Sequence, residues 1–305
     1  MSDLQGICPI IATPFTNQGD VDYDSFRNLV RTLVQGGCPG VTLFGIAGEY
    51  YKLSDEESLR LVKITVEECR ANGGKSIVSV TQHATELAVK RARLYQEEGA
   101  DCLMLLPPFF LKPSAEALYG HMKAVGQVVE IPVMAQYAPE QTGVAIQPKV
   151  FARLFSEVPN IRYYKIECKP AGSYISTLLE ETSRKISVFL GNAGYQFIEC
   201  FDRGAVGALP GCSMFDIYLK MYDEYISGDR AAAMKTHSEL VLPILNHIRQ
   251  NVEMIIAYEK RILKKRGIIA SDYCRKPTFT KDPIYDRIFE EHYERIVPYF
   301  NGMRG

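Results

Sequence analysis

The first candidate for chemistry is a lysine in the middle of an aromatic and apolar segment. Residues 161–169 read I-R-Y-Y-K-I-E-C-K, which has the length and β-branched content of one strand, and Pro170 follows. A buried ammonium group is costly, and a buried lysine commonly responds by giving up its proton. Because a free, desolvated amine attacks ketones to form Schiff bases, Lys165 is a candidate nucleophile.

Glu167 supplies a second interpretation of the same lysine. Side chains alternate along a strand, so Lys165 and Glu167 share a face. The two can form a structural ion pair, or the face can be solvated, and neither arrangement needs a reaction. The rest of the chain has to separate these interpretations.

Two other features favour chemistry at Lys165. Tyr137 ends the neighbouring expected strand at a matching height, where a phenol can pass protons to and from a substrate. The turn Gly45-Ile46-Ala47-Gly48 leaves backbone N–H groups free near a helix start, which suits a carboxylate. Amine, phenol and turn together describe a site for a 2-oxo acid.

The elements that position these residues alternate between strand and helix. The expected strands cover residues 6–13, 40–44, 76–80, 101–106, 131–137, 161–169, 186–190 and 205–209. Eight strands alternating with helical segments are typical of a (β/α)8 TIM barrel, an α/β fold. A doubly wound open sheet is the competitor, but no G-x-G-x-x-G follows the first strand. Beyond residue 228 only helices are expected, so we predict a barrel over 1–228 and a C-terminal helical extension over 229–305.

Reactive groups of such barrels gather at the carboxyl ends of the strands. Those ends also carry Glu167, Gly191, Asn192 and Gly211, which we expect to bind substrate. Gly211-Cys212-Ser213 lacks the remainder of a nucleophile elbow.

Composition excludes several other classes of protein. The 305 residues carry a net charge of −1, which predicts neither a nucleic-acid partner nor electrostatic membrane contact. No run approaches the roughly 20 apolar residues of a membrane span, and the amino terminus lacks the pattern of a secretory signal. The eight cysteines are scattered singly with no C-x-x-C pair, so we expect no metal site and a reducing, cytoplasmic setting.

Several short motifs occur in order along the chain. They are Gly6-Ile7-x-Pro9 with Thr13-Pro14-Phe15, Gly45-x-x-Gly48-Glu49, Pro107-Pro108-Phe109-Phe110 with Pro113, the strand ending at Tyr137, Tyr164-Lys165-Ile166-Glu167, and Gly204-Ala205-Val206-Gly207-Ala208. As a set, these motifs resemble the dihydrodipicolinate synthase / N-acetylneuraminate lyase family of Schiff-base-forming barrels over nearly the whole chain. The resemblance implies that Lys165 is the Schiff-base lysine, Tyr137 the proton relay, and the Ile46-Ala47-Gly48 backbone the carboxylate cradle. It also implies homotetramers or dimers and no dissociable cofactor.

Departures from the synthase pattern bear on the substrate. Ile46 and Ala47 stand where the synthases have two threonines, Phe110 matches an interface tyrosine, and Gln141 loosely matches a carboxylate-binding arginine. From these matches we expect Phe110 and Gln141 to bind substrate. Glutamine lacks the bidentate grip of arginine, so these changes argue against lysine biosynthesis. Tyr164-Lys165-Ile166-Glu167 followed by Pro170 resembles the L-2-keto-3-deoxyarabonate dehydratase branch of the family, although that branch differs around the second strand and at Tyr137.

We therefore expect a class I lyase that acts on a 2-oxo acid, with dehydration of a 2-keto-3-deoxy sugar acid as the leading reaction. A pyruvate-dependent aldolase or a dihydrodipicolinate synthase-type condensation is the alternative within enzymes. A barrel that binds a 2-oxo acid without turning it over is the alternative outside them.

Overall fold

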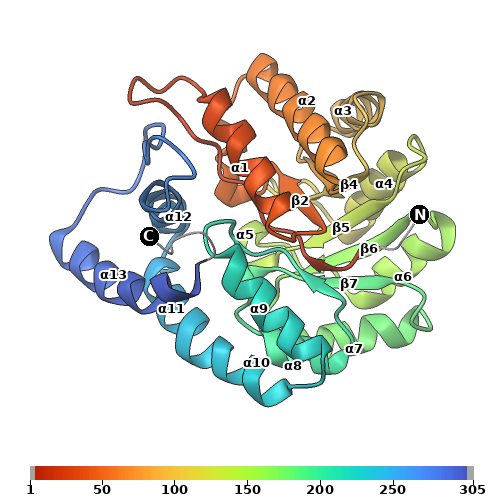
Figure 1. Ribbon diagram of the computed structural model, residues 1–305. Coiled ribbons are helices and arrows are strands. Elements are labelled where there is room, and N and C mark those ends of the chain that lie inside the picture. Colours follow the sequence, from red (N-terminus) through yellow and green to blue (C-terminus); the bar gives the residue numbers. More distant parts are fainter. Residues whose placement is uncertain (1–3, 301–305) are drawn as a thin grey trace. The chain divides into compact units, whose positions relative to one another are not determined.

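The computed structural model describes residues 4–300; residues 1–3, part of the segment considered for a secretory signal, and 301–305, the end of the predicted extension, lie outside this range. Strands and helices alternate along the chain, and the eight strands form one sheet in the order β1-β8-β7-β6-β5-β4-β3-β2 (Figure 1). The predicted (β/α)8 barrel with C-terminal helices is confirmed. The chain groups into two compact units, Lys75–Leu209 and the residues on either side of it. The boundary predicted at residue 228 stays a prediction.

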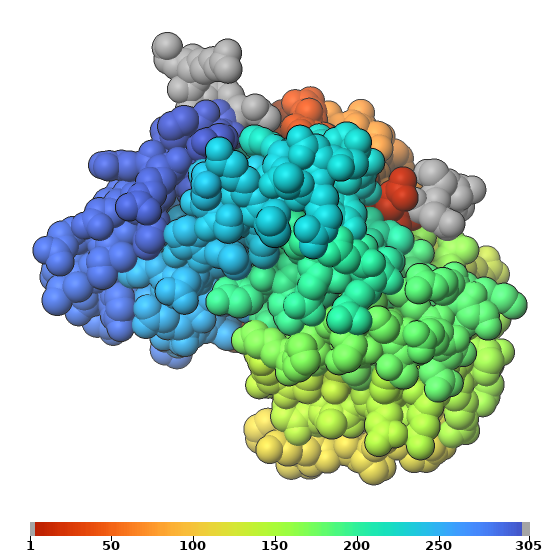
Figure 2. Space-filling view, turned by 90° about the horizontal axis from the view of Figure 1, so that it is seen from below, coloured from red at the N-terminus to blue at the C-terminus, as the bar shows by residue number. Residues whose placement is uncertain are grey.

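The unit Lys75–Leu209 contains six of the strands. They are β3 (Lys75–Val80), β4 (Cys102–Leu105), β5 (Val133–Tyr137), β6 (Ile161–Ile166), β7 (Ser187–Leu190) and β8 (Gly207–Ala208). Each pairs in parallel with the next. Its helices are α3 (Thr85–Glu97), α4 (Ala115–Gly126), α5 (Pro139–Thr142), α6 (Pro148–Glu157), α7 (Ala171–Glu181) and α8 (Phe197–Arg203), with a 3₁₀ turn η3 (Asn192–Gly194). The strands are buried almost throughout, as expected for a parallel sheet covered on both faces. Figure 2 shows one face of the molecule, on which residues of this unit are coloured from yellow to green.

The other unit carries both ends of the described chain. Its first part holds β1 (Gly6–Ile7), α1 (Tyr23–Gln35), β2 (Gly40–Leu43), the 3₁₀ turns η1 (Ile46–Gly48) and η2 (Tyr50–Lys52), and α2 (Asp55–Asn72). Its second part holds α9 (Phe215–Ile226), α10 (Arg230–Thr236), the π-helical turn η4 (His237–Val241), α11 (Leu242–Ile248), α12 (Val252–Lys265), α13 (Pro283–Ile296) and the 3₁₀ turn η5 (Val297–Tyr299). Ser54 and Glu57 form a capping box at the start of α2.

Local chemistry explains where elements differ from the predicted ranges. The first strand is only Gly6–Ile7, and Ile10 then makes isolated bridges to Thr42 and Gly211. In the C-terminal helices, the π-helical turn η4 separates α10 from α11 just before Pro243, which has no N–H to continue a regular ladder. Within residues 4–300, no helix is both long and apolar enough to cross a membrane. All eight cysteines are buried free thiols.

Candidate active site

Lys165 lies one residue before the end of β6 and is almost completely buried, with 4% of its surface exposed. Its neighbours in the parallel ladder are Gln136 on β5 and Phe189 on β7. Its Nζ atom lies 3.1 Å from Oε1 of Glu167. The ion pair considered from the sequence is therefore present, and it places a carboxylate directly beside the candidate nucleophile.

The Glu167 carboxylate is held from both neighbouring strands. The Gln136 amide donates to Oε2 at 2.6 Å, and the backbone N–H of Asn192 donates to Oε1 at 3.0 Å. Burial alone would raise the pKa of this carboxyl group, but the Lys165 charge, the Asn192 N–H and the Gln136 amide outweigh it and leave the pKa below its ordinary value. Glu167 is therefore ionised at neutral pH.

Gly191 and Asn192, which follow β7, help to position Glu167 through their backbone atoms. A Cβ atom on Gly191 would stand 2.1 Å from Cγ of Glu167, a distance that real Cβ atoms essentially never show. Asn192 adopts a left-handed conformation with φ of 54°, which Asn tolerates better than most residues. Gly191 thus leaves room for the Glu167 side chain, and the backbone N–H of Asn192 donates a hydrogen bond to its carboxylate.

Tyr137 does not occupy the height expected for it. The register pairs Lys165 with Gln136 and pairs Tyr137 with Ile166, so Tyr137 belongs to the opposite face of the sheet. Its ring stacks on Tyr174 of α7 at 4.5 Å and meets Phe151 of α6 edge-on. The predicted position of Tyr137 was therefore wrong by one residue. The residue of β5 that lies beside Lys165 depends on the register between the two strands, which the sequence alone does not give. The relay role of Tyr137 stays a prediction.

Gln136 is the residue that sequence reasoning missed. It is buried, shares the face of Lys165, and hydrogen-bonds the same carboxylate. The available signal was its polar side chain one residue before the end of β5, the same position that Lys165 has on β6.

Phe110 and Gln141, both expected to bind substrate, lie on the surface of this unit. Phe110 is 79% exposed in the segment after β4, where its ring meets His83 edge-on. Gln141 is exposed on the short helix α5. Their contacts with substrate stay predictions.

The turn with Ile46, Ala47 and Gly48 belongs to the other compact unit. These three residues form η1, in which the Gly48 N–H donates to Gly45 and the Glu49 N–H to Ile46. Gly48 is required sterically, since a Cβ atom there would stand 2.8 Å from the Ile11 carbonyl oxygen. The N–H groups that open this turn are those expected to receive a carboxylate.

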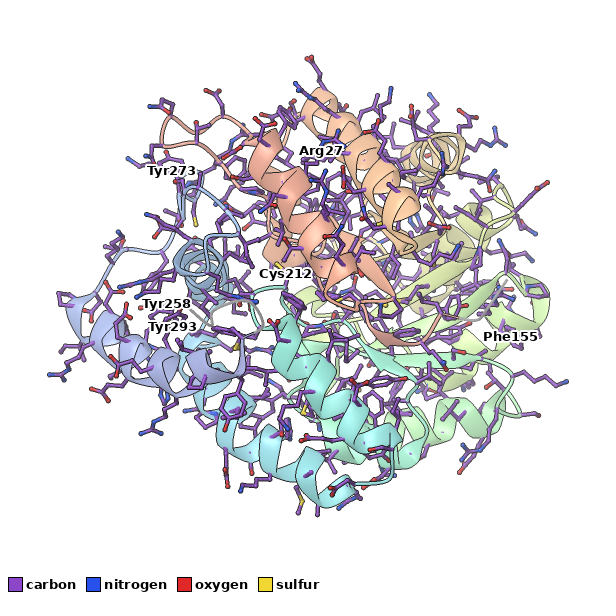
Figure 3. All side chains as sticks on the ribbon, in the orientation of Figure 1. Arg27, Phe155, Cys212, Tyr258, Tyr273 and Tyr293 are labelled. Carbon is purple, nitrogen blue, oxygen red and sulfur yellow. The ribbon has the colours of Figure 1, made fainter. Side chains whose placement is uncertain are left out.

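Glu49 fastens this turn through a buried charge cluster. It is fully buried in a left-handed conformation, between Lys52, whose Nζ lies 2.9 Å from Oε2, and Lys260 of α12, whose Nζ contacts Oε1. Lys260 also donates to the carbonyl of Tyr273 at 3.1 Å and lies 4.2 Å from the centroid of the Phe15 ring. Burial lowers the pKa of Lys260, and Glu49 opposes that shift only partly. Figure 3 labels Tyr273 in the segment that follows α12.

Gly211, in the same unit, faces a second buried carboxyl group. A Cβ atom at this position would stand 2.1 Å from Oε1 of Glu259, and the other oxygen of Glu259 accepts the Ser213 N–H at 2.9 Å. Burial raises the pKa of Glu259. The glycines predicted at the ends of β7 and β8 therefore each make room for a carboxyl side chain. Among residues 4–300, no three His, Cys, Asp or Glu side chains are grouped so as to hold a metal ion.

Comparison with known proteins agrees with this architecture. The model of the dihydrodipicolinate synthetase family matches residues 3–291. The 4-hydroxy-tetrahydrodipicolinate synthase of Bacillus velezensis is 31% identical over 249 residues, which are 81% of this chain and 84% of the relative. That of Bacillus subtilis is 30% identical over 239 residues, 77% of this chain and 81% of the relative.

A solved structure shows the same likeness in three dimensions. The crystal structure of dihydrodipicolinate synthase from Rhodopseudomonas palustris superposes with a TM-score of 0.89 at 26% identity, covering 96% of this chain and 97% of that one. The family consists of lyases that act on small molecules. The resemblance to the L-2-keto-3-deoxyarabonate dehydratase branch stays a prediction, because these relatives carry the synthase name. The chain belongs to the dihydrodipicolinate synthetase family.

Proposed function

We propose that Lys165 condenses with the ketone of pyruvate and that the resulting enamine attacks an aldehyde carbon, so that the enzyme makes or breaks a carbon–carbon bond. The observation that carries this proposal is the buried amine of Lys165 at the carboxyl end of β6, beside the fixed carboxylate of Glu167. The imine that this amine forms with the ketone makes the C3 protons of pyruvate acidic.

The comparisons bear on which reaction is proposed first. The sequence favours dehydration of a 2-keto-3-deoxy sugar acid, but the relatives above are named as synthases, and this supports the condensation alternative better. Gln141 stands in place of the guanidinium expected in a synthase, so we propose an aldehyde without the second carboxylate that lysine biosynthesis requires.

Substrate carboxylate binding is proposed for the backbone of Ile46, Ala47 and Gly48. The N–H groups at the start of a helical turn attract anions, and Glu49 with its two lysines fixes the end of this turn. No dissociable cofactor enters the proposal. Phe110, exposed with its neighbour Leu111, is proposed to face a partner subunit in a dimer or tetramer.

Dehydration remains the second candidate, and Glu167 is the observation that favours it. A carboxylate beside the imine nitrogen can take the C3 proton, after which the enamine expels a C4 hydroxyl group. This route needs no aldehyde partner.

The test uses the purified enzyme with pyruvate and borohydride, followed by peptide mass mapping. Reduction should add pyruvate to Lys165 and leave the Lys165→Met variant unmodified; an adduct on a different lysine would overturn the assignment. Pyruvate with a panel of aldehydes, and 2-keto-3-deoxy sugar acids alone, then separate condensation from dehydration by their products. Tight binding of 2-oxo acids without any turnover would support a binding protein instead.

A further inference from the structure

The side chain beside the proposed nucleophile is placed to move protons as well as to balance charge. Glu167 follows β6 directly, is 8% exposed, and has one oxygen 3.1 Å from Nζ of Lys165. Its second oxygen is bound by Gln136. An ion pair that served only stability would gain little from such burial, because desolvation of two charges offsets most of their attraction.

Three strands cooperate to hold this carboxylate in one orientation. Gln136 reaches it from β5, and the Asn192 N–H reaches it from the end of β7. Gly191 has no side chain where Glu167 lies, since a Cβ atom there would overlap with the carboxylate stem. Groups that transfer protons need this kind of fixed position within hydrogen-bond reach of the reacting atom.

Schiff-base formation requires a group that takes one proton and returns it. The Lys165 ammonium gives a proton to the Glu167 carboxylate, and the free amine then forms a C–N bond to the ketone carbon. One proton of that nitrogen moves to the carbonyl oxygen, which becomes a hydroxyl group. The carboxylic acid returns its proton to that hydroxyl as the C–O bond breaks, so that water leaves and a protonated imine remains. The regenerated carboxylate next takes a C3 proton, and the electron pair of that C–H bond forms the enamine.

We propose that Glu167 is the catalytic acid and base of this site and that Gln136 and the Asn192 N–H are its positioning groups. This inference rests on the proposed function of Lys165. It assigns to Glu167 the proton transfer that the family resemblance gives to Tyr137. The register supports the assignment, because Gln136 shares the Lys165 face and Tyr137 points toward α6 and α7.

Exchange of the pyruvate methyl hydrogens for deuterium measures the proposed steps without an aldehyde partner. The exchange is followed by proton NMR in D2O for the wild type, Glu167→Gln, Gln136→Leu and Lys165→Met. Glu157→Gln is the matched control, because Glu157 forms ion pairs with Lys123 and Arg153 at the surface of the same unit. Removal of a general acid–base group lowers rates by about 10²–10⁴-fold.

The expected pattern separates catalysis from structure. Glu167→Gln should fold and slow exchange by about 100-fold or more, Gln136→Leu should slow it by about 10-fold, and Glu157→Gln should leave it unchanged. Formate should restore part of the rate in Glu167→Ala, and the wild-type rate should fall in acid as Glu167 is protonated, a decline that Glu167→Gln lacks.

Glu167→Gln exchanging within threefold of the wild type would overturn the inference, as would a folded Glu167→Ala that formate leaves inactive. If Glu167→Gln fails to fold, Glu167→Asp is measured in its place. A folded Glu167→Asp with the wild-type exchange rate and an unchanged pH profile would overturn the inference. Slower exchange, with a changed loss of rate at acid pH, would support it. Absence of both adduct and exchange in the wild type would instead refute the proposed function itself.

Discussion

Replacement of Lys260 by methionine tests how the turn expected to bind a carboxylate is held. Methionine keeps the length of the side chain but removes the ammonium group that contacts Glu49 and the Tyr273 carbonyl. Removing one partner of a buried ion pair costs about 3–5 kcal/mol, because the other charge remains buried. Lys52 still contacts Glu49 in the variant, so we expect the lower end, about 3 kcal/mol.

The assay is thermal unfolding followed by calorimetry. A loss of about 3 kcal/mol lowers the melting temperature by about 6–12 °C for a chain of this size. The control is Lys264→Met on the same helix, whose ion pair with Asp272 is 49% exposed on the lysine side and should contribute at most about 1 kcal/mol. The double variant Lys260→Met with Glu49→Gln should melt higher than the sum of the single effects predicts, since no uncompensated charge remains.

Two results would refute this reasoning. The first is a Lys260→Met protein that melts within 2 °C of Lys264→Met. The second is strict additivity of Lys260→Met and Glu49→Gln, because the two groups are in contact and their effects must be coupled if the ion pair matters.

Three further changes have defined outcomes. Gly191→Ala should lower the free energy of unfolding by about 2 kcal/mol or more in chemical denaturation, because the new Cβ displaces Glu167. The same variant should lose most of the deuterium exchange. The control Gly120→Ala, with open space at its Cβ in α4, should be neutral or stabilising. Tyr137→Phe should keep pyruvate exchange within tenfold of the wild type, because its ring packs away from Lys165; a 100-fold loss would restore the phenol relay. Burial, with the nearby His83, lowers the pKa of His121 to about 4. The unfolded chain therefore binds this proton more readily, so stability is complete above pH ~6.5 and falls by about 3 kcal/mol toward pH 4, a slope that His121→Gln should flatten in urea titrations.

Much of the fold follows from the sequence because parallel barrel strands are short, apolar and bounded by turn residues. Strand β4 is buried along its length, β7 is buried except at Ser187, and both were recognisable as apolar runs. The capping box of α2 is a local pattern of two side chains, and it too could be read directly. The first strand was expected too long, because the apolar run 6–13 continues past the last laddered residue, Ile7.

The neighbours of a strand residue on the adjacent strand could not be predicted from the sequence in the same way. Alternation places Lys165 and Glu167 on one face, and the structure confirms that the two side chains are in contact. Which residue of β5 stands beside Lys165 depends on inter-strand register, and a shift of one residue exchanges Gln136 for Tyr137. The sequence therefore placed Lys165 and Glu167 together but named the wrong neighbour of Lys165 on β5, and the nucleophile role of Lys165 stays a prediction.

Gly191 and Gly211 were predicted to bind substrate, and that role stays a prediction. The structure gives a further reason for a glycine at each position, because Gly191 accommodates Glu167 and Gly211 accommodates Glu259. These carboxyl groups come from residues 24 and 48 positions away in the sequence, so no local pattern reveals the contact. Because each glycine is matched to one buried acid, loss of the acid should make the glycine replaceable: Gly191→Ala should be tolerated far better in a Glu167→Ala background than in the wild type. Equal destabilisation in the two backgrounds would show that Gly191 is required for another reason.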